Sequence, residues 1–168
     1  MPPAAGYAIS QFWILFPFTR GSVHLESTSL STINSPAFDP RLFLNDIDIQ
    51  GTVALGRRSY EFWETSPASE LATGYFLPEE GALDGNSTSA EWADFLTGQA
   101  GVCNHPLASA AMMSKELGGV VDSELKVYGT SNVRVVDASV LPTQISGHLT
   151  AVIYAVAEKA ADLIKEAQ

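Results

Sequence analysis

Hydrophobic residues recur at helical spacing in two long segments of the chain. Between residues 41 and 63 the apolar positions fall roughly every three or four residues, which predicts one or two helices with Gly51 and Gly56 as weak points. Residues 150–167 carry one stripe of apolar side chains with charged side chains outside it, a pattern typical of an amphipathic helix. These two segments should supply the long helices of the fold.

Shorter patterns predict one more helix and several strands. Ser89 can cap a helix over 91–96, because a hydroxyl at the N-cap satisfies a backbone amide that has no helical partner. The stretches 27–40 and 66–89 are rich in turn-forming residues and are predicted to be loops. Short apolar runs bounded by turn formers indicate strands; these runs are 12–16, 22–25, 120–122, 125–129 and 133–137.

Composition and charge narrow the possible functions. The 168 residues are 46% hydrophobic, which is enough to bury a core in a single domain. The formal net charge of −10, with only 9 Lys and Arg, argues against nucleic-acid binding, because phosphate contacts need clustered basic side chains. One cysteine, Cys103, and three histidines exclude a disulfide framework and a thiolate zinc cluster, so no metal site is expected.

No apolar run reaches the roughly 18 to 20 residues that a membrane-spanning helix needs. The strongest candidate, 12–18, contains Pro17, is followed at once by Arg20, and has no basic segment ahead of it, so it is not a signal peptide. A soluble protein with no membrane contact is expected, either cytoplasmic or secreted. The triplet Asn86-Ser87-Thr88 is an acceptor sequence for N-glycosylation and hints at secretion.

Two histidines occupy positions suited to acid–base chemistry. His105 lies between Asn104 and Pro106, ahead of an apolar run, and His148 lies just before the predicted C-terminal helix. A neutral imidazole in an apolar pocket has a lowered pKa and can take a proton from an alcohol near neutral pH. Each can equally be a core histidine whose ring is satisfied by a backbone carbonyl, so both interpretations stay open.

Asp137 also permits two interpretations. It ends the apolar run 133–136, so it can cap a helix or turn, or it can anchor a ligand at the end of a buried strand. Nearby, Gly147 and His148 at the start of the last predicted helix would present free backbone amides. Such amides favour an anion or a polarised carbonyl oxygen.

Several motifs occur together in the last 65 residues. They are His105-Pro106-Leu107-Ala108-Ser109, Gly118-Gly119-Val120-Val121-Asp122, Val127-Tyr128-Gly129, Asn132-Val133-Arg134-Val135-Val136-Asp137-Ala138-Ser139, Pro142, Gly147-His148 and Ala157-Glu158-Lys159-Ala160-Ala161-Asp162. This combination resembles the C-terminal signature of the glucose-methanol-choline (GMC) flavin oxidoreductases. Upstream, 17–25 and 39–46 resemble the substrate domain of the branch that includes glucose oxidase, aryl-alcohol oxidase and versicolorin B synthase.

The resemblance implies a role for each matched residue. His105 matches the histidine that faces the flavin ring and takes or shares the substrate's hydroxyl proton, and His148 matches its partner. Hydride would pass from the alcohol carbon to flavin N5. Asp137 and Ala138 match positions that hold the ribityl-pyrophosphate portion, and the backbone around His148 matches the one at the pyrimidine edge. The FAD-binding residues implied in this way are Asp137, Ala138, His148, Leu149 and Thr150.

Two features depart from the family pattern. Ala108-Ser109 stands where the family usually has Gly-Thr, which would crowd the substrate pocket or alter its hydrogen bonding. The family's glycine-rich turn that cradles the FAD pyrophosphate has no counterpart, since no GxGxxG occurs in the sequence. The chain therefore resembles only the C-terminal third of such an enzyme.

The resemblance implies an α+β fold. We expect a mostly antiparallel substrate-domain sheet with helices on one face, plus the C-terminal strand and helix of a flavin-binding domain that lacks its N-terminal Rossmann half. Residues 1–104 would form the substrate-binding domain, and 105–168 the signature segment that completes the flavin site. Apolar surface exposed in this arrangement would favour a homo-oligomer or a complementary chain.

Three functions stay open. In the first, the chain is part of an FAD-dependent oxidoreductase that oxidises an alcohol once another chain supplies the FAD-binding half. In the second, it is a flavin-free cyclase, dehydratase or isomerase of secondary metabolism, because proton transfer between His105 and His148 needs no redox cofactor. In the third, it is a noncatalytic relic. The aromatic residues could line a pocket for an aryl or polyketide-like substrate, or simply fill the core.

Overall fold

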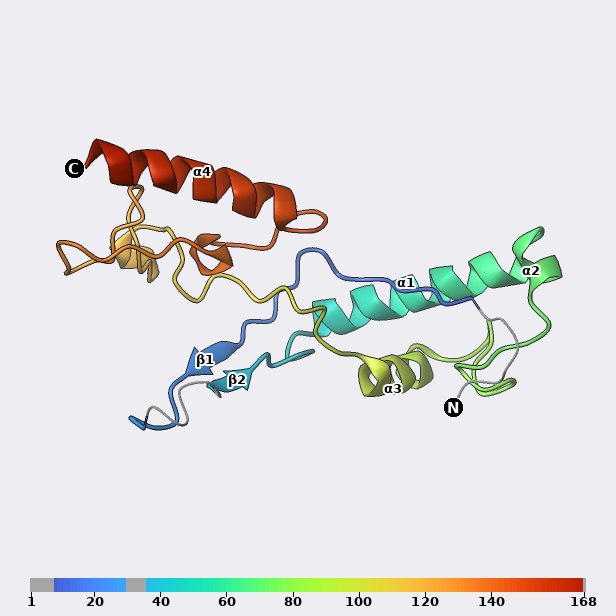
Figure 1. The fold of residues 1–168 in the computed structure, drawn as a ribbon. Coiled ribbons are helices and arrows are strands. Elements are labelled where there is room, and N and C mark those ends of the chain that lie inside the picture. Colours follow the sequence, from blue (N-terminus) through green and yellow to red (C-terminus); the bar gives the residue numbers. More distant parts are fainter. Residues whose placement is uncertain (1–7, 30–35, 168) are drawn as a thin grey trace. The chain divides into compact units, whose positions relative to one another are not determined.

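The computed structural model describes residues 8–29 and 36–167, and the chain divides into two compact units (Figure 1). The first unit, Met1–Ile14 with Leu42–Gly101, is called the helical unit below. The second, Leu15–Arg41 with Val102–Gln168, contains all three histidines of the chain and is called the histidine unit. The predicted division between 1–104 and 105–168 concerns segments of a larger fold and stays a prediction.

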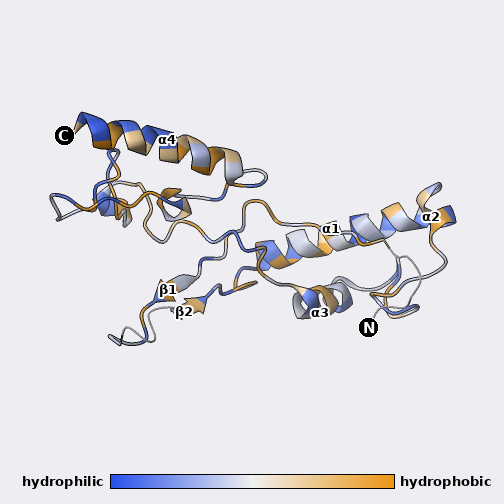
Figure 2. Ribbon diagram, viewed as in Figure 1, coloured by the Kyte–Doolittle hydropathy of each residue, from blue (hydrophilic) through white to orange (hydrophobic). Residues whose placement is uncertain are grey.

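Among its described residues, the helical unit contains three helices, α1 (Asp46–Glu64), α2 (Ala68–Leu71) and α3 (Ser89–Gln99). The helix predicted within 41–63 is confirmed as the single helix α1, which begins where Asn45 Oδ1 accepts a hydrogen bond from the Ile47 backbone N–H at 2.9 Å. Figure 2 shows hydrophobic positions recurring along α1 between hydrophilic ones. The short helix α2 lies inside the predicted loop 66–89, and Ser89 at the end of that segment is the first residue of α3. The rest of the segment consists of turns, bends and irregular backbone.

Close packing of α1 against α3 explains why α1 continues through its glycines. A Cβ atom on Gly56 would lie 2.6 Å from Leu96 Cδ1, so the missing side chain lets the two helices approach. Trp92 of α3 is 2% exposed, and the Arg57 guanidinium lies 5.8 Å from the centre of its ring. The buried core of this unit consists of Val53, Leu83 and Trp92.

Thr88, and not Ser89, caps α3. The Thr88 hydroxyl accepts from the Glu91 backbone N–H at 3.3 Å, and the Glu91 carboxylate accepts from the Thr88 backbone N–H at 2.6 Å. This reciprocal capping box holds the first turn of the helix, so Ser89 becomes its first residue. The predicted helix 91–96 is thus confirmed and extended, while its predicted cap is wrong by one position.

The predicted strand 12–16 does not form. Ile14 instead faces α1, where a Cβ on Gly51 would lie 3.4 Å from Ile14 Cδ1, and Ser10 Oγ accepts from Trp63 Nε1 at 2.7 Å. Residues 8–14 therefore follow the surface of a helix, and no strand among the described residues pairs with them.

In the part of the histidine unit that the structure describes, there is a small antiparallel sheet and one long helix. Strand β1 (Ser22–His24) pairs with β2 (Ala37–Asp39), with Val23 opposite Phe38. The strand 22–25 is confirmed as β1, whereas β2 falls in the predicted loop 27–40, of which 30–35 lie outside the described residues. Helix α4 (Thr150–Glu166) confirms the predicted amphipathic helix.

The core of the histidine unit is small and made of short side chains. Ala160 of α4 is 1% exposed and packs into a cluster with Val121, Leu125 and Val140. Short 3-10 turns occur at Lys115–Leu117 and Ala138–Val140.

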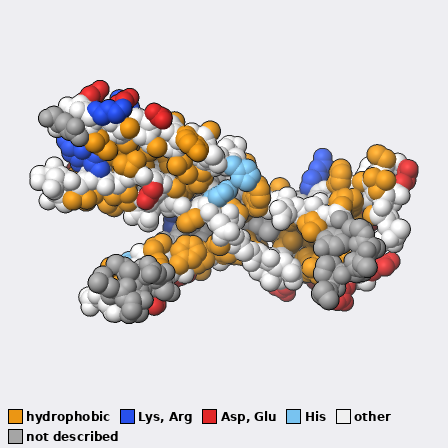
Figure 3. Space-filling model, in the orientation of Figure 1, with side chains coloured by type: hydrophobic (Ala, Val, Ile, Leu, Met, Phe, Trp, Pro, Cys, Tyr) orange, Lys and Arg blue, Asp and Glu red, His pale blue; other side chains and the backbone are white. Residues whose placement is uncertain are grey.

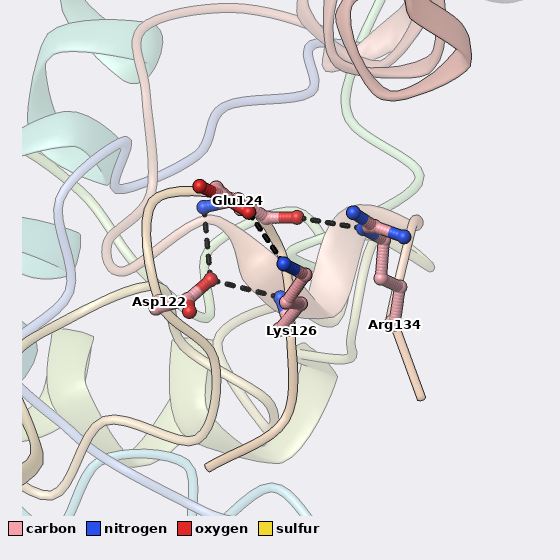
Figure 4. Close-up of polar contacts among 4 residues, drawn as sticks. All are labelled: Asp122, Glu124, Lys126 and Arg134. Atoms are coloured by element: carbon pink, nitrogen blue, oxygen red, sulfur yellow. Dashed lines mark hydrogen bonds and ion pairs between the residues drawn. The ribbon is translucent and has the colours of Figure 1, made fainter. Parts of the chain in front are cut away.

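The predicted strands 120–122, 125–129 and 133–137 are reduced to isolated bridges, which pair Val121 with Met112 and Val127, and Lys126 with Arg134. The cause is a turn at Asp122, whose carboxylate accepts from the backbone N–H groups of Glu124 (2.8 Å) and Lys126 (2.9 Å) in place of a strand partner (Figure 4). Arg134 Nε donates to the Glu124 carbonyl at 3.0 Å and ties the next segment to this turn (Figure 4).

A second turn lies beyond these bridges. Gly129 has a φ of 80°, a left-handed conformation that glycine adopts without strain. The turn is closed by a hydrogen bond from the Val127 N–H to the Val133 carbonyl at 2.9 Å, and residues 129–132 are exposed.

The α+β class is confirmed: helices accompany an antiparallel sheet that has two strands in the described residues. In the same part of the chain, no helix has both the length and the apolar character required to cross a membrane.

Candidate functional site

The structure brings the two predicted histidines together within the histidine unit. The ring centres of His105 and His148 are 5.2 Å apart, and the rings meet edge to face at 84°. His105 is half-buried and His148 is exposed. Figure 3 shows histidine atoms at the surface, bordered by hydrophobic and uncharged atoms. The two residues are 43 positions apart in the sequence, so the fold and not local chain geometry creates this pair.

His105 is oriented by an unusual backbone on both sides. Asn104 and Ala108 have φ values of 58° and 70°, in the left-handed region that side chains other than glycine seldom adopt. Beyond Ala108, the Ala110 N–H donates to the Ser139 carbonyl at 3.0 Å and the Met112 N–H donates to the Val140 carbonyl at 2.8 Å. These two bonds hold the segment that follows His105 against residues 139–140.

His148 is positioned by the start of α4. Gly147, with a φ of 86°, turns the chain into the helix, and Leu149 is 4% exposed at the helix N-cap. Its carbonyl accepts from the Ile153 N–H at 2.9 Å. Because Ala160 anchors the same helix in the core, the place of His148 depends on how α4 packs.

Val140 connects the supports of both histidines. Its carbonyl fixes the segment that follows His105, and its fully buried side chain packs in the cluster that contains Ala160 of α4. The pair is therefore held by one buried residue that contacts two different supporting segments.

Asp137 acts in the structure as a turn cap. Its Oδ1 atom accepts from the backbone N–H of Ser139 at 2.8 Å and also accepts from the Ser139 hydroxyl. These contacts begin the 3-10 turn Ala138–Val140, in agreement with the capping interpretation. Asp137 itself is exposed and Ala138 is half-buried, so the Asp137 carboxylate also stays accessible from solvent.

The remaining predicted residues lie at the first turn of α4. Leu149 turns its side chain into the core, so it can reach a ligand only through its backbone, whereas Thr150 is exposed. No side chain caps this helix, and its first turn holds no acidic residue. The first N–H groups of α4 lack helical acceptors by geometry, so this end of the helix is a hydrogen-bond donor surface.

Three supporting residues were not among the predicted site residues: Asn104, Ser139 and Val140. Ser139 and Val140 supply the carbonyls that hold the segment after His105, and only a structure reveals such backbone partners. A signal for the left-handed turn was present, because Ala108 stands where the resembled family usually has glycine. The described residues contain no group of three or more His, Cys, Asp or Glu side chains placed to hold a metal ion.

The arrangement can move a proton. One imidazole of such a pair can accept a hydroxyl proton while the other supports the resulting charge or passes the proton on, and imidazole performs both tasks near neutral pH.

Comparison with known proteins gives a consistent set of similarities. A family model described as GMC oxidoreductase matches residues 17–157. Among curated proteins, the chain is 51% identical over 162 residues to the glucose oxidase-like protein fsoC of Humicola fuscoatra, covering 96% of this chain and 27% of that protein. It is 36% identical over 160 residues to glucose oxidase 2 of Penicillium expansum, covering 95% and 26%.

Comparison with solved structures also finds similar oxidoreductases. An FAD-dependent oxidoreductase from Chaetomium thermophilum matches with a TM-score of 0.78 and 35% identity over 90% of this chain and 25% of that one. A fungal aryl-alcohol oxidase matches with a TM-score of 0.75 and 33% identity over 89% and 24%. The chain thus spans about a quarter of the length of the proteins that it matches.

Proposed function

This chain belongs to the GMC oxidoreductase family, and it matches the family's C-terminal domain. We propose that it forms the proton-handling side of an FAD-dependent site that oxidises an alcohol. The observation that carries the proposal is the edge-to-face pair of His105 and His148, with ring centres 5.2 Å apart. The names of similar proteins, glucose oxidase 2 and an aryl-alcohol oxidase, point to small-molecule CH–OH donors.

The residues of this chain would manage the substrate's hydroxyl proton. When the alcohol carbon is oxidised to a carbonyl, that proton must leave, and one imidazole accepts it as general base. The neighbouring ring stabilises the base in the required orientation through their edge-to-face contact. FAD, when bound, supplies the acceptor for the hydride from the alcohol carbon.

The residues present fit a flavin. The first turn of α4 offers backbone donors with no side-chain cap and no acidic neighbour, which suits the carbonyl oxygens at the pyrimidine edge of the ring. His148, Leu149 and Thr150 would supply this contact. Asp137 Oδ1 already accepts two hydrogen bonds from Ser139, so the other carboxylate oxygen of Asp137 would accept from a ribityl hydroxyl. Ala138, the next residue in the chain, would lie against the same portion of the cofactor.

We propose that the remaining FAD contacts come from a segment outside these 168 residues, on a longer polypeptide or a complementary chain. Exposed apolar side chains on the histidine unit support this, for example Tyr154 of α4, which is 68% exposed. Native mass spectrometry should show a complex with such a segment or self-association. A clean monomer that does not respond to the added segment would contradict this part of the proposal.

The visible absorption spectrum of the chain, recorded with FAD and the complementary segment, tests the function. We expect a protein-bound flavin band that an alcohol substrate bleaches. His105→Ala and His148→Ala should slow the bleaching by about 10²- to 10⁴-fold, because each removes a member of the proton-handling pair. His24→Ala is the matched control, since His24 lies in β1 and is exposed.

The pH dependence separates proton handling from simple support of the fold. The rate of bleaching should rise with deprotonation of an imidazole in the unaltered chain, and this dependence should disappear in the variants while the flavin band remains. Bleaching at the original rate in both variants would refute the role of the pair.

The same pair also suits the flavin-free alternative, because proton relay between two imidazoles requires no redox partner. A dehydration, cyclisation or isomerisation that proceeds without FAD and requires both histidines would favour this second function.

A further inference from the structure

The triplet Asn86-Ser87-Thr88 has no part in the proposed chemistry. It is the single N-glycosylation acceptor sequence in the chain, which has five asparagines. It lies in the helical unit, in the turn that leads into α3, and Asn86 is exposed.

The turn leaves room for a large group. A Cβ atom built on the preceding residue, Gly85, would meet no atom within 4 Å, so the chain around Asn86 borders open space. The backbone fixes the turn without requiring a bulky side chain: Asp84 Oδ1 accepts from the N–H groups of Asn86 at 2.7 Å and Ser87 at 2.8 Å. A glycan on the Asn86 amide would therefore displace no buried residue.

In the folded chain, a glycosylating enzyme could not bind the triplet through its threonine hydroxyl. The Thr88 hydroxyl donates to Glu91 Oε2 at 2.8 Å and accepts from the Glu91 N–H at 3.3 Å, so both of its hydrogen-bonding roles are occupied. The Ser87 carbonyl accepts from the Arg57 guanidinium on α1. An extended acceptor segment with an accessible hydroxyl exists only before the capping box of α3 has formed.

We propose that Asn86 is an N-glycosylation site that is modified before α3 folds. The Asn86 side-chain nitrogen forms a bond to C1 of a sugar carried on a lipid-linked oligosaccharyl pyrophosphate. The bond between that C1 and the pyrophosphate oxygen breaks, the lipid pyrophosphate leaves, and the amide gives up one proton. No oxidant or reductant takes part.

The test begins with the protein isolated from the organism that produces it. Treatment with peptide N-glycosidase in ¹⁸O-water should convert Asn86 to a labelled Asp, which peptide mass spectrometry locates, and it should remove a mobility shift on a denaturing gel. Native protein without label at residue 86 would overturn the proposal.

The order of modification and folding is tested by translation into microsomes with a cleavable leader, which requires no stable product. Asn86→Gln should lose the glycosidase-sensitive shift while keeping the cap. Thr88→Ser, which retains both the triplet and a capping hydroxyl, should keep the shift. Glu91→Ala preserves the triplet and removes the capping box, so it should be modified at least as fully as the unaltered chain. Loss of the shift in Glu91→Ala would overturn the proposed order.

Discussion

The two units of this chain reach stability by different means. The helical unit packs two regular helices around Trp92, a large side chain, and its contacts repeat at helical spacing. The histidine unit surrounds α4 with turns and isolated bridges, and its core is built from Val121, Val140 and other short side chains. Regular structure thus dominates in one unit, while the candidate chemistry lies where irregular backbone brings distant residues together.

The aromatic residues make the two units separately observable. All three tryptophans, Trp13, Trp63 and Trp92, belong to the helical unit, and all three histidines belong to the histidine unit. Tryptophan fluorescence therefore reports on one unit and imidazole proton resonances on the other, so each variant below can be assigned to the unit it disturbs.

The largest effect is expected from Trp92→Ala. Removing this buried ring from between α1 and α3 should cost about 3–5 kcal/mol, through lost burial and the cavity left behind. Denaturation followed by tryptophan fluorescence should show the loss, while the imidazole resonances of the histidine unit stay unchanged. Leu71→Ala, at an exposed position of α2, is the control and should change stability by less than about 0.5 kcal/mol. Equal disturbance of both probes by Trp92→Ala would show that the two units fold as one.

A smaller loss is expected from Val140→Ala in the other unit. It deletes two methyl groups from a fully buried position and should cost about 2 kcal/mol. Because Val140 supports both segments that hold the histidines, the resonances of His105 and His148 should shift together while that of His24 does not. Val133→Ala, at a position that is 47% exposed, provides the matched control. A shift of only one of the paired histidines would contradict the shared support.

Ala108→Gly should stabilise the histidine unit. Ala108 holds a φ of 70°, where a side chain is strained and glycine is not, so the substitution should gain about 1 kcal/mol or slightly less. Thermal unfolding read by the imidazole resonances measures this gain. Ala110→Gly is the control that tests whether glycine is favoured only at the left-handed position. It should destabilise the histidine unit, because Ala110 does not have a positive φ. Destabilisation by Ala108→Gly would refute the strain.

The smallest expected effect is a loss of stability of the helical unit at low pH, which arises from carboxylates at and before the N-terminal cap of α3. Hydrogen bonds from the Thr88 backbone N–H and hydroxyl lower the pKa of Glu91, and the backbone N–H groups of Asn86 and Ser87 lower that of Asp84. A lowered folded-state pKa contributes stability that is present above the ordinary carboxyl pKa and is lost as pH falls through the folded value. Between pH 6 and pH 3 the helical unit should therefore weaken by tryptophan fluorescence.

Glu91→Gln should flatten part of this pH dependence, because glutamine retains the capping geometry without a titrating group. An unaltered acid response in Glu91→Gln would remove Glu91 from the explanation.

The sequence predicted the regular parts of the fold well. Helical spacing located α1 and α4, because in both helices the apolar face is formed by residues three or four positions apart in the sequence. It also singled out His105 and His148, whose proximity the structure then revealed. It did not anticipate β2, which lies in a segment rich in turn-forming residues. It also did not anticipate the loss of the strands around Val121, because the Asp122 carboxylate and the left-handed φ of Leu125 act through backbone geometry that hydrophobic patterns do not record.

The turn at Gly129 has a practical consequence for engineering. It is exposed, and two backbone hydrogen bonds close it: the Val127 N–H donates to the Val133 carbonyl at 2.9 Å, and the Thr130 N–H donates to the Val127 carbonyl at 3.1 Å. The backbone hydrogen bonds described above for the segments next to His105 and His148 do not involve residues 129–132. This turn is therefore a suitable place to graft an epitope or a labelling tag, since added residues there lengthen a surface connection without changing the spacing of the two imidazoles.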